Sequence, residues 1–343
     1  MGLYDFESHK SGTEEIDKKY VFKDMVDDRK FIPAWGLIIY LLFVHIGSFY
    51  GLYLTFTSAL FYTIIFSLVC DAFGSFGVTA GAHRLWAHKA YKATQPLRII
   101  LMILNTLLYQ GTIIHWVRDH RTHHKNTDTP ADPHNANYGF MYSHIGWLIR
   151  KKSPIVVKEG AKIDLSDLYE DPVLKFQEKY RTTFVPFVGI VLPTIIPIYF
   201  WGESLNNAFF LNILRYTISL HFTLCINSLA HLIGGKPYDQ KILPRENRFC
   251  SFITSGEGFH NYHHTFPWDY KAAEHSGHIL NPTTTFIDFF AKIGWAYDLK
   301  TTSQEMIKKR TARTGYANHI WGWDDKDLTK DDTEGAIIKN KKI

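Results

Sequence analysis

The chain has 343 residues, of which 46% are hydrophobic and 15% aromatic, and it contains 18 histidines. Its 23 glycines, 13 prolines and 3 cysteines are too few for a collagen-like, low-complexity or disulfide-framework protein. A net charge of +5, scattered along the chain, excludes a nucleic-acid-binding protein, whose basic residues would gather on one face.

Four long apolar runs organise the chain, at residues 33–54, 57–80, 184–201 and 207–232. Asp71 and Arg215 are the only charged residues within them. Each run reaches or approaches the ~20 residues that a helix needs to cross ~30 Å of hydrocarbon. Buried core helices are the alternative, but four long runs with two charges favour an integral membrane protein with four transmembrane helices.

The distribution of lysine and arginine orients these four helices. The connections at residues 55–57 and 202–206 contain neither residue, and every cation except Arg215 lies outside the runs and these connections. The positive-inside rule therefore places both termini and the long middle segment in the cytosol. We expect a cytosolic N-terminal tail at 1–30, a single all-α domain at 31–314 with a helical cytosolic cap from 81–183 and 233–314, and a charged C-terminal tail at 315–343.

The two ends of the chain bear on where the protein is targeted in the cell. The first 30 residues are polar and charged, so no secretory signal peptide is expected. Lys341 and Lys339 stand third and fifth from the C-terminus, a spacing similar to that of a retrieval signal of the endoplasmic reticulum. A solvated basic tail explains the same residues equally well.

Eight histidines form three clusters whose spacing indicates metal binding. The first cluster is a pair, and the other two share the spacing i, i+3, i+4; the residues are His83, His88, His120, His123, His124, His260, His263 and His264. This spacing places three imidazoles on one side of a helix, and imidazole is the commonest nitrogen ligand of first-row metals. A lone histidine is more often structural, but eight exceed what one ion accepts, so we expect a di-metal site.

A fifth apolar stretch, Leu97–Ile114, is interrupted by Arg98, Asn105 and Gln110. If it crossed the bilayer, the first histidine cluster would lie on the opposite side of the membrane from the second. The two clusters could then not share a site. With four spans, all three clusters are cytosolic and can converge, so we predict that Leu97–Ile114 does not span.

The segments around these clusters resemble a known family. They are Gly81–His88, Trp116–His124, Ala131–Ala136, Asn227–His231 and Gly258–Pro267. Over roughly residues 30 to 300 the chain resembles the membrane fatty acyl-CoA desaturases of the stearoyl-CoA desaturase type, and this pattern of histidine boxes is highly specific. The stretch Trp268–Glu274 is most similar to insect members.

The resemblance implies that two iron ions (Fe²⁺) are bound by these histidines, in an enzyme of the endoplasmic reticulum membrane. It adds His231 as a ninth histidine ligand and Asn227 as a residue that reaches the metal through water. It also implies that the remaining histidines are not ligands: His9, His45, His115, His134, His144, His221, His275, His278 and His319.

The implied substrate is a fatty acyl-CoA that enters from the cytosol, with its acyl chain in a bent tunnel among the helices. Trp116 and Thr223 match residues that enclose the bend beside the metals. The residues that match the CoA entrance are Arg118, Asp119, Lys151 and Lys152. Lysine side chains there can attract the phosphates of CoA, whereas contact with the anionic headgroups of membrane lipid is the alternative.

Asp71 lies twelve residues before His83, near the expected closed end of the tunnel. A carboxylate inside a span is costly and usually functional. We expect Asp71 to shorten or polarise the tunnel end, and an ion pair with Arg215 is the alternative. Four residues depart from the family pattern at positions associated with CoA or tunnel contacts: Gly36, Leu37, Gly111 and Leu224.

The implied reaction inserts a cis double bond into a saturated acyl chain with O₂ and two electrons, most commonly at the Δ9 position. No acid or base side chain could remove hydrogen from an unactivated CH₂, because an alkyl C–H is far too weak an acid. The sequence has no flavin, nicotinamide or haem motif, and the resemblance implies cytochrome b5 with its NADH-dependent reductase as the electron donor. We expect Asp119 and Glu257 to orient imidazoles by hydrogen bonds.

Three alternatives stay open on the sequence. A membrane hydroxylase or alkane oxygenase would share the first hydrogen abstraction, but its product gains oxygen. A histidine-rich metal transporter would hold its ligands inside the spans, whereas eight of the nine histidines lie at or beyond the predicted span ends. In the third alternative the histidines bind adventitious zinc and the protein has no activity.

Overall fold

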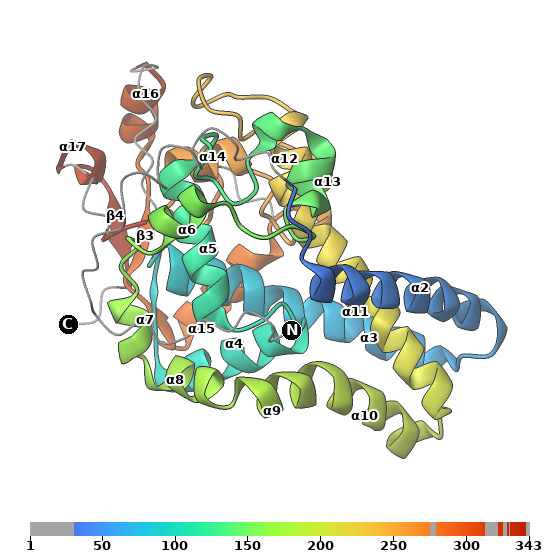
Figure 1. Ribbon diagram of the computed structural model, residues 1–343. Coiled ribbons are helices and arrows are strands. Elements are labelled where there is room, and N and C mark those ends of the chain that lie inside the picture. Colours follow the sequence, from blue (N-terminus) through green and yellow to red (C-terminus); the bar gives the residue numbers. More distant parts are fainter. Residues whose placement is uncertain (1–30, 275–278, 313–321, 325–327, 329, 341–343) are drawn as a thin grey trace.

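The computed structural model describes residues 31–274, 279–312, 322–324, 328 and 330–340. Long apolar helices project to one side, and shorter helices form a cap at their other end (Figure 1). The apolar group is α2 (Trp35–Thr57), α3 (Phe61–Phe76), η1 (Gly77–Ala87), α9 (Arg181–Pro186), η4 (Phe187–Val191), α10 (Leu192–Trp201), α11 (Leu205–Asn227) and α12 (Leu229–Leu232).

The cap is also mostly helical. Its helices are α4 (Gln95–Leu107), α5 (Ile113–Asn126), η2 (Ala136–Tyr138), η3 (Tyr142–Gly146), α6 (Pro154–Gly160), α7 (Ser166–Glu170), α8 (Pro172–Lys179), α13 (Arg248–Ile253), α14 (His260–Thr265), α15 (Pro282–Lys292), α16 (Gln304–Ala312) and α17 (Lys330–Thr333). Its strands form two antiparallel pairs: β1 (Lys92–Ala93) with β2 (Ala296–Tyr297), and β3 (Leu299–Thr301) with β4 (Ile337–Lys339).

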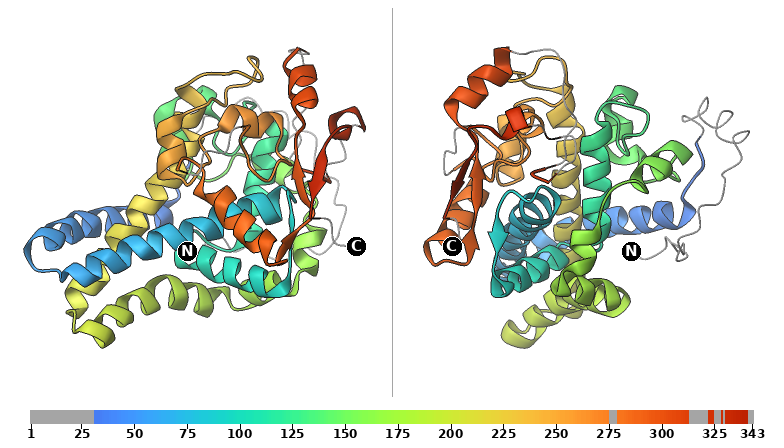
Figure 2. Two further views of the ribbon diagram at one scale, coloured as in Figure 1. Left: turned by 180° about the vertical axis from the view of Figure 1, so that it is seen from behind. Right: turned by 90° about the vertical axis from the view of Figure 1, so that its left-hand side faces the viewer.

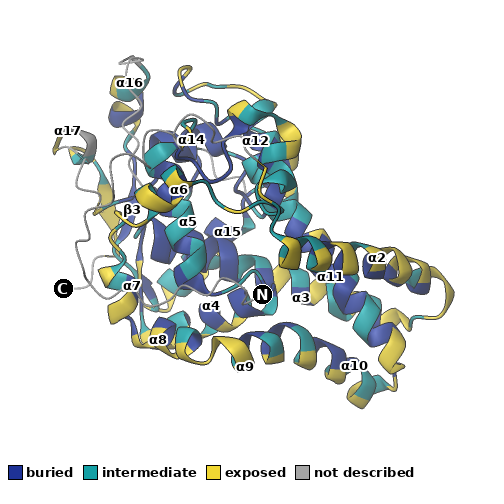
Figure 3. Cartoon of the chain, viewed as in Figure 1, coloured by how far each residue is buried: buried dark blue, intermediate teal, exposed yellow. Residues whose placement is uncertain are grey.

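Four helical segments of the described chain are long and apolar enough to cross a membrane: Trp35–Thr57, Phe61–Ala87, Arg181–Trp201 and Leu205–Leu232. Their large apolar side chains face outward, as shown by Phe49, Phe56 and Tyr199, which are 76%, 82% and 81% exposed (Figure 3). Such a surface is stable in lipid rather than in water. The prediction of a helical protein with four membrane-spanning helices is confirmed, and the two short strand pairs of the cap are the departure from an all-α fold.

The first connection between spans lies at residues 58–60 rather than 55–57. The hydroxyls of Thr55 and Thr57 donate to the carbonyls of Gly51 and Tyr53, 2.8 and 2.9 Å away, so the helix continues past both threonines. The turn instead ends where the Leu60 N–H donates to the Glu203 carboxylate at 2.8 Å. Hydropathy alone could not place this boundary, because threonine is tolerated both inside a helix and at its end.

The second span continues beyond the predicted residue 80 into the cap. The π-helix η1 extends it to Ala87, so His83 belongs to the same helical segment as the membrane-embedded α3. Gly77 allows this packing, because a Cβ there would overlap the backbone of Asn105 on α4. π-Helical turns are rare and occur frequently at functional sites.

α4 contains most of the fifth apolar stretch. It has 13 residues, and a buried stripe that includes Leu97, Leu101 and Asn105 packs on η1. A helix of this length spans about 20 Å, less than the ~30 Å hydrocarbon core. In agreement with the prediction for Leu97–Ile114, it is a cap helix by its length.

The described part of the C-terminal segment contacts the cap. Strand β4 pairs with β3, and Figure 2 places both on the side of the cap that lies away from the apolar helices. The backbone N–H of Trp323 donates to the carbonyl of His88 at 3.1 Å. The N-terminal tail at 1–30 and residues 341–343 of the lysine motif lie outside the described residues.

Candidate metal centre and substrate cavities

Nine histidines from four segments of the chain come together within the cap in two groups. The first group consists of His83, His88, His120, His124 and His263, and the second consists of His123, His231, His260 and His264. Within each group the ring nitrogens lie within 4.8 Å of one another. These are the nine histidines that the boxes and the resemblance singled out.

The rings face one another through the same atom. In the first group the Nε2–Nε2 separations are 3.0 Å for His83–His263, 2.7 Å for His88–His120 and 3.1 Å for His263–His124. In the second group the separations are 3.3, 3.1 and 3.0 Å, for the pairs His123–His264, His264–His260 and His260–His231.

This geometry fits bound metal ions. Two imidazoles at right angles on one metal, with bonds of about 2.1 Å, have their nitrogens about 3.0 Å apart. Burial, together with the neighbouring rings, holds the pKa values of five of these histidines well below their usual range: His120, His124, His260, His263 and His264. Neutral imidazoles are the form that binds metals, so each group is ready to accept an ion.

Buried carboxylates support two of the rings at the nitrogen that faces away from the group. Glu257 Oε2 lies 2.9 Å from Nδ1 of His83, and Asp132 Oδ1 lies 2.9 Å from Nδ1 of His123. The partly buried Asp128 lies farther from its ring, with Oδ1 3.9 Å from Nδ1 of His231, which is beyond hydrogen-bond distance. A carboxylate at Nδ1 fixes the orientation of the ring and leaves Nε2 for the metal. The expectation for Glu257 agrees with this arrangement, whereas Asp128 and Asp132 were not predicted.

Asp119 does not have the role expected for it. Both of its carboxylate oxygens lie 2.6 Å from the ammonium of Lys152, and its other partners are Arg118 and His115, which belongs to neither histidine group. Burial alone would raise the pKa of Asp119, but these cations hold it well below its usual range. Asp119 is therefore an ionised carboxylate in a cluster of cations, and it contacts no imidazole of the two histidine groups.

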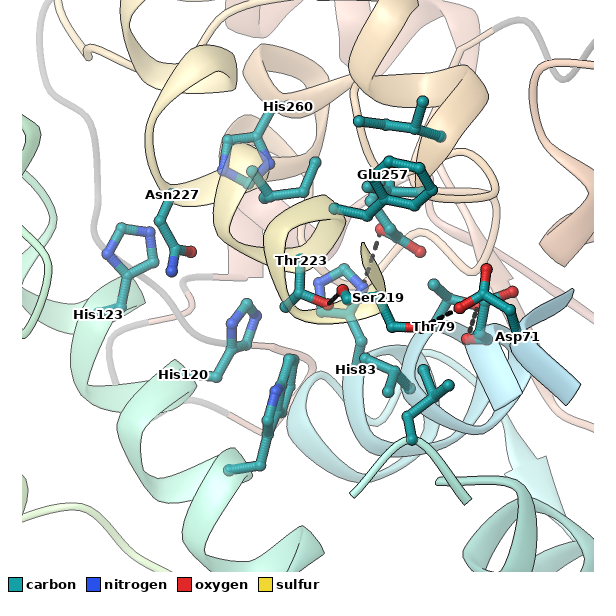
Figure 4. Close-up of a pocket in the computed structure, with 18 residues that line it drawn as sticks. Asp71, Thr79, His83, His120, His123, Ser219, Thr223, Asn227, Glu257 and His260 are labelled. Atoms are coloured by element: carbon teal, nitrogen blue, oxygen red, sulfur yellow. Dashed lines mark hydrogen bonds and ion pairs between the residues drawn. The ribbon is translucent and has the colours of Figure 1, made fainter. Parts of the chain in front are cut away.

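A narrow apolar cavity runs along the histidine groups (Figure 4). His83, His120, His123 and His260 line it on the side of the metal-binding groups, together with Asn227. The indole of Trp116 stacks on His120 with ring centroids 4.8 Å apart. Trp116 and the other predicted bend residue, Thr223, both line this cavity, as do Asp71, Ser75, Thr79 and Ser219 at its polar part.

Asp71 accepts a hydrogen bond from the Ser219 hydroxyl inside this cavity. Arg215 is not its ion-pair partner: the guanidinium donates to Asn212 at 2.8 Å and to the carbonyl of Leu107 at 3.1 Å. The alternative of an Asp71–Arg215 ion pair is therefore wrong, because Arg215 is held by acceptors on its own helix and on α4. Asp71 is left as a carboxylate that faces the cavity.

A second cavity, of about 1210 Å³, is wider and more polar. Its walls include the predicted entrance residues Arg118, Asp119, Lys151 and Lys152, and also the four departures from the family pattern, Gly36, Leu37, Gly111 and Leu224. The two cavities share Trp116, His120, Thr223 and Asn227 in their walls. They therefore meet beside the histidine groups, with the basic mouth on one side and the apolar end on the other.

Comparison with known proteins assigns the chain to a family. A model of the fatty acid desaturase family matches residues 58–275. The chain belongs to the fatty acid desaturase family. Members of this family are oxidoreductases, and the match covers the segments that contain all nine clustered histidines.

Individual relatives are similar over most of their length. The chain is 55% identical to the acyl-CoA Delta(11) desaturase of Spodoptera littoralis, over 88% of this chain and 90% of the relative. It is 50% identical to the acyl-CoA Delta-9 desaturase of Acheta domesticus, over 90% and 87%. It is 49% identical to stearoyl-CoA desaturase 5 of Bos taurus, over 82% and 84%. The resemblance to stearoyl-CoA desaturases and to insect members is confirmed.

The contact between the C-terminal segment and His88 predicts the effect of one substitution. A Cβ at Gly322 would lie 2.5 Å from the backbone oxygen of His88, and backbone atoms cannot move aside as a flexible side chain can. Gly322→Val is therefore expected to displace His88 and to lower the metal affinity of the five-histidine group by about 10- to 100-fold, the effect typical of disturbed ligand support. Metal content after dialysis against a graded chelator series measures this.

Gly235→Val is the matched control. Gly235 lies in the same cap, and a Cβ there would meet nothing within 4 Å. This variant is expected to keep the metal content of the native protein. Equal metal retention by the two variants would contradict a role for the Gly322–His88 contact.

Proposed function

We propose that this protein is an acyl-CoA desaturase that introduces a cis double bond into a saturated fatty acyl-CoA. The observation that carries the proposal is the position of the nine histidines, at the point where a basic, polar cavity meets a narrow apolar one. A molecule with an anionic head and a long alkyl chain fits such a pair of cavities. The names of the relatives support the same substrate class.

Each site residue then has a role. The nine histidines hold two iron ions, and Asn227 reaches the four-histidine group through water. When bound, the two irons supply the redox chemistry that removes hydrogen from an unactivated methylene with O₂ as the oxidant. The substrate residues divide between the tunnel wall and its entrance: Trp116, Thr223, Arg118, Asp119, Lys151, Lys152 and Asp71.

The side chains of the cavities position the substrate and exclude water. Trp116 and Thr223 belong to both cavities, so they hold the acyl chain where it passes the metals. The hydroxyl of Thr223 accepts from the Gln110 amide at 2.8 Å, which fixes this wall. The Asp119 carboxylate holds Lys152 at the mouth and leaves Lys151 for the phosphates of CoA.

We assign the double bond to Δ9 as the commonest outcome in the family, with other positions open to test. Relatives of 55% and 50% identity are named for Δ11 and Δ9, so overall identity does not decide between them. Position depends on how far the acyl chain enters the narrow cavity before it passes the metals.

The protein is proposed to reside in the endoplasmic reticulum membrane with both termini in the cytosol, surrounded by membrane lipid. Electrons are proposed to come from cytochrome b5 and its NADH-dependent reductase. The positive-inside distribution of lysine and arginine supports the orientation. A cationic cytosolic face suits an acidic donor, so turnover should fall as ionic strength rises.

The function is tested by expressing the full chain in a host that lacks its own desaturase and analysing its acyl chains by mass spectrometry. The expected product has lost two hydrogens relative to the saturated substrate, and derivatisation of the double bond gives its position. A product that gains one oxygen would indicate the hydroxylase alternative. Absence of any product from iron-loaded protein supplied with reduced cytochrome b5 would overturn the proposal.

Asp71 is expected to set the length of the acyl chain that the narrow cavity accepts. Asp71→Ala removes the carboxylate and lengthens the cavity by about one or two methylenes, each worth roughly 10- to 200-fold in selectivity. We expect the ratio of kcat/KM for an 18-carbon over a 16-carbon acyl-CoA to rise by at least about 10-fold. Competition between the two substrates measures the ratio directly.

Asp71→Asn separates the two possible roles of this residue. The amide has the same size as the carboxyl and can still accept from Ser219, but it has no charge. If Asp71 acts by shape, Asn behaves as the native protein and only Ala changes selectivity. If it acts by polarity, both variants change it, and an unaltered preference in both would remove Asp71 from the substrate site.

A further inference from the structure

Three histidines outside the metal-binding groups form a continuous chain of hydrogen bonds where α2, α11 and the cap meet. Nδ1 of His45 lies 2.6 Å from the carbonyl oxygen of Leu41, and its Nε2 lies 3.0 Å from Nε2 of His221. Nδ1 of His221 lies 2.9 Å from Nε2 of His144, and Nδ1 of His144 lies 2.9 Å from the hydroxyl of Ser228. This chain of hydrogen bonds therefore ends at Ser228, the residue that follows Asn227.

This arrangement does not suit a metal ion. His221 faces His45 with Nε2 and His144 with Nδ1, so the ring nitrogens follow one another instead of converging on a point. No described carboxylate or cation forms an ion pair with any of the three rings. All three rings are half-buried, so none of them is sealed inside the protein core.

When all three rings are neutral, every hydrogen bond of this series can form, with each group donating to the next in the same direction. The carbonyl of Leu41 only accepts, so Nδ1 of His45 carries a hydrogen and its Nε2 accepts from His221. His221 then accepts at Nδ1 from His144, and His144 accepts at Nδ1 from the Ser228 hydroxyl. Each imidazole has one hydrogen and one lone pair, as a neutral ring requires.

The same contacts also accommodate one additional proton. The hydroxyl of Ser228 has a second acceptor, the carbonyl of Leu224 at 3.0 Å. If Ser228 donates to Leu224, its oxygen is free to accept from Nδ1 of His144. The extra proton can then reside on any of the three rings, because each transfer across an N–H···N contact leaves all other hydrogen bonds intact.

We propose that His45, His221 and His144 form a proton relay that holds one excess proton beside the metal centre, with the Ser228 hydroxyl as its switch. Ser228 donates to His144 when the relay is empty and to Leu224 when it is loaded. Burial lowers the pKa of His144 from its usual value, so the empty form is favoured near neutral pH and the loaded form gains population as the pH falls.

A use for this proton follows if the proposed function is right. Desaturation of –CH₂–CH₂– with O₂, two electrons from an external donor protein and two protons gives –CH=CH– and two molecules of water. The relay can supply one of the two protons consumed in each turnover. This step rests on the proposed function, whereas the existence of the relay does not.

The relay itself is tested on the full-length protein with its metal sites filled by diamagnetic Zn²⁺ and with ¹⁵N-labelled histidine, by following ring nitrogen shifts from pH 5 to pH 8. The expected result is that the three rings titrate together and take up a single proton. In the variant His221→Asn, His45 and His144 should titrate separately, each with a full proton. Independent titration of all three rings in the native protein would overturn the relay, and so would the absence of any proton uptake by them.

A kinetic measurement tests its use. The glutamine in His144→Gln can still hydrogen-bond to His221 but cannot carry an added proton. We expect kcat to fall several-fold with KM unchanged, and the solvent deuterium isotope effect on kcat to rise. A kcat and an isotope effect equal to those of the native enzyme would show that the relay does not serve turnover. If the protein had no desaturase activity at all, the titration result would still stand, so the two failures are distinguishable.

Discussion

Replacing His263 by alanine is expected to abolish product formation and to remove one of the two metal ions. His263 contacts both His83 and His124 through Nε2, at 3.0 and 3.1 Å, and is 1% exposed. Its loss leaves the five-histidine group without the ring that contacts both His83 and His124, whereas the four-histidine group keeps all of its members. Elemental analysis of purified His263→Ala should give about half the metal of the native protein, since each group is proposed to bind one ion.

His134→Gln is the matched comparison. His134 is as buried as the ligands and its ring centroid lies 4.3 Å from that of His123, but it belongs to neither of the two groups. It does lie with His123 and Asp132 in a third set of potential ligands. If the two-group assignment is right, His134→Gln keeps its full metal content. Loss of metal from His134→Gln, or full metal content in His263→Ala, would contradict the assignment.

Among the substitutions described, breaking the buried ion pair between Arg84 and Glu257 is expected to lower the free energy of unfolding most. Arg84 is 1% exposed, and its guanidinium donates twice to Glu257, at 2.9 and 3.1 Å. Further bonds join it to the Tyr270 carbonyl at 3.0 Å and to Thr284 at 3.1 Å. Arg84→Met leaves a buried carboxylate without its cation, which costs about 3–5 kcal/mol. Denaturation of the protein in detergent micelles measures this change.

Two further variants make this result specific. Arg84→Met combined with Glu257→Met removes both charges and should recover much of the lost stability, because a buried ion pair can often be exchanged for apolar residues at little cost. The double variant should still bind metal about 10- to 100-fold more weakly, since His83 has lost its carboxylate. Lys162→Met, in an exposed pair with Glu159, should change stability by no more than about 1 kcal/mol.

The sequence was sufficient to predict what depends on local pattern. Four apolar runs gave the four spans, since crossing a bilayer requires uninterrupted hydrophobic length. Spacing of i, i+3, i+4 gave six of the clustered histidines, because a helix brings such positions to one side. His231 has no such spacing, and only the family resemblance singled it out.

Contacts between distant segments had no local signal. Arg84 and Glu257 are 173 residues apart, and His45 and His221 are 176 apart. Asp132, which holds His123, lies in an irregular turn where no periodicity applies. The expectation that Asp119 orients an imidazole of the histidine groups was wrong, because neighbouring residues on a helix, such as Asp119 and His120, face different directions.

The unbroken passage from α3 into η1 couples the membrane to the metal centre mechanically. His83 stands on the same rod as residues embedded in hydrocarbon, so a displacement of α3 along its axis by one residue would move this ligand by about 1.5 Å. Reactive centres tolerate only about 0.5 Å of such error. The thickness of the surrounding bilayer thereby becomes a parameter of ligand geometry.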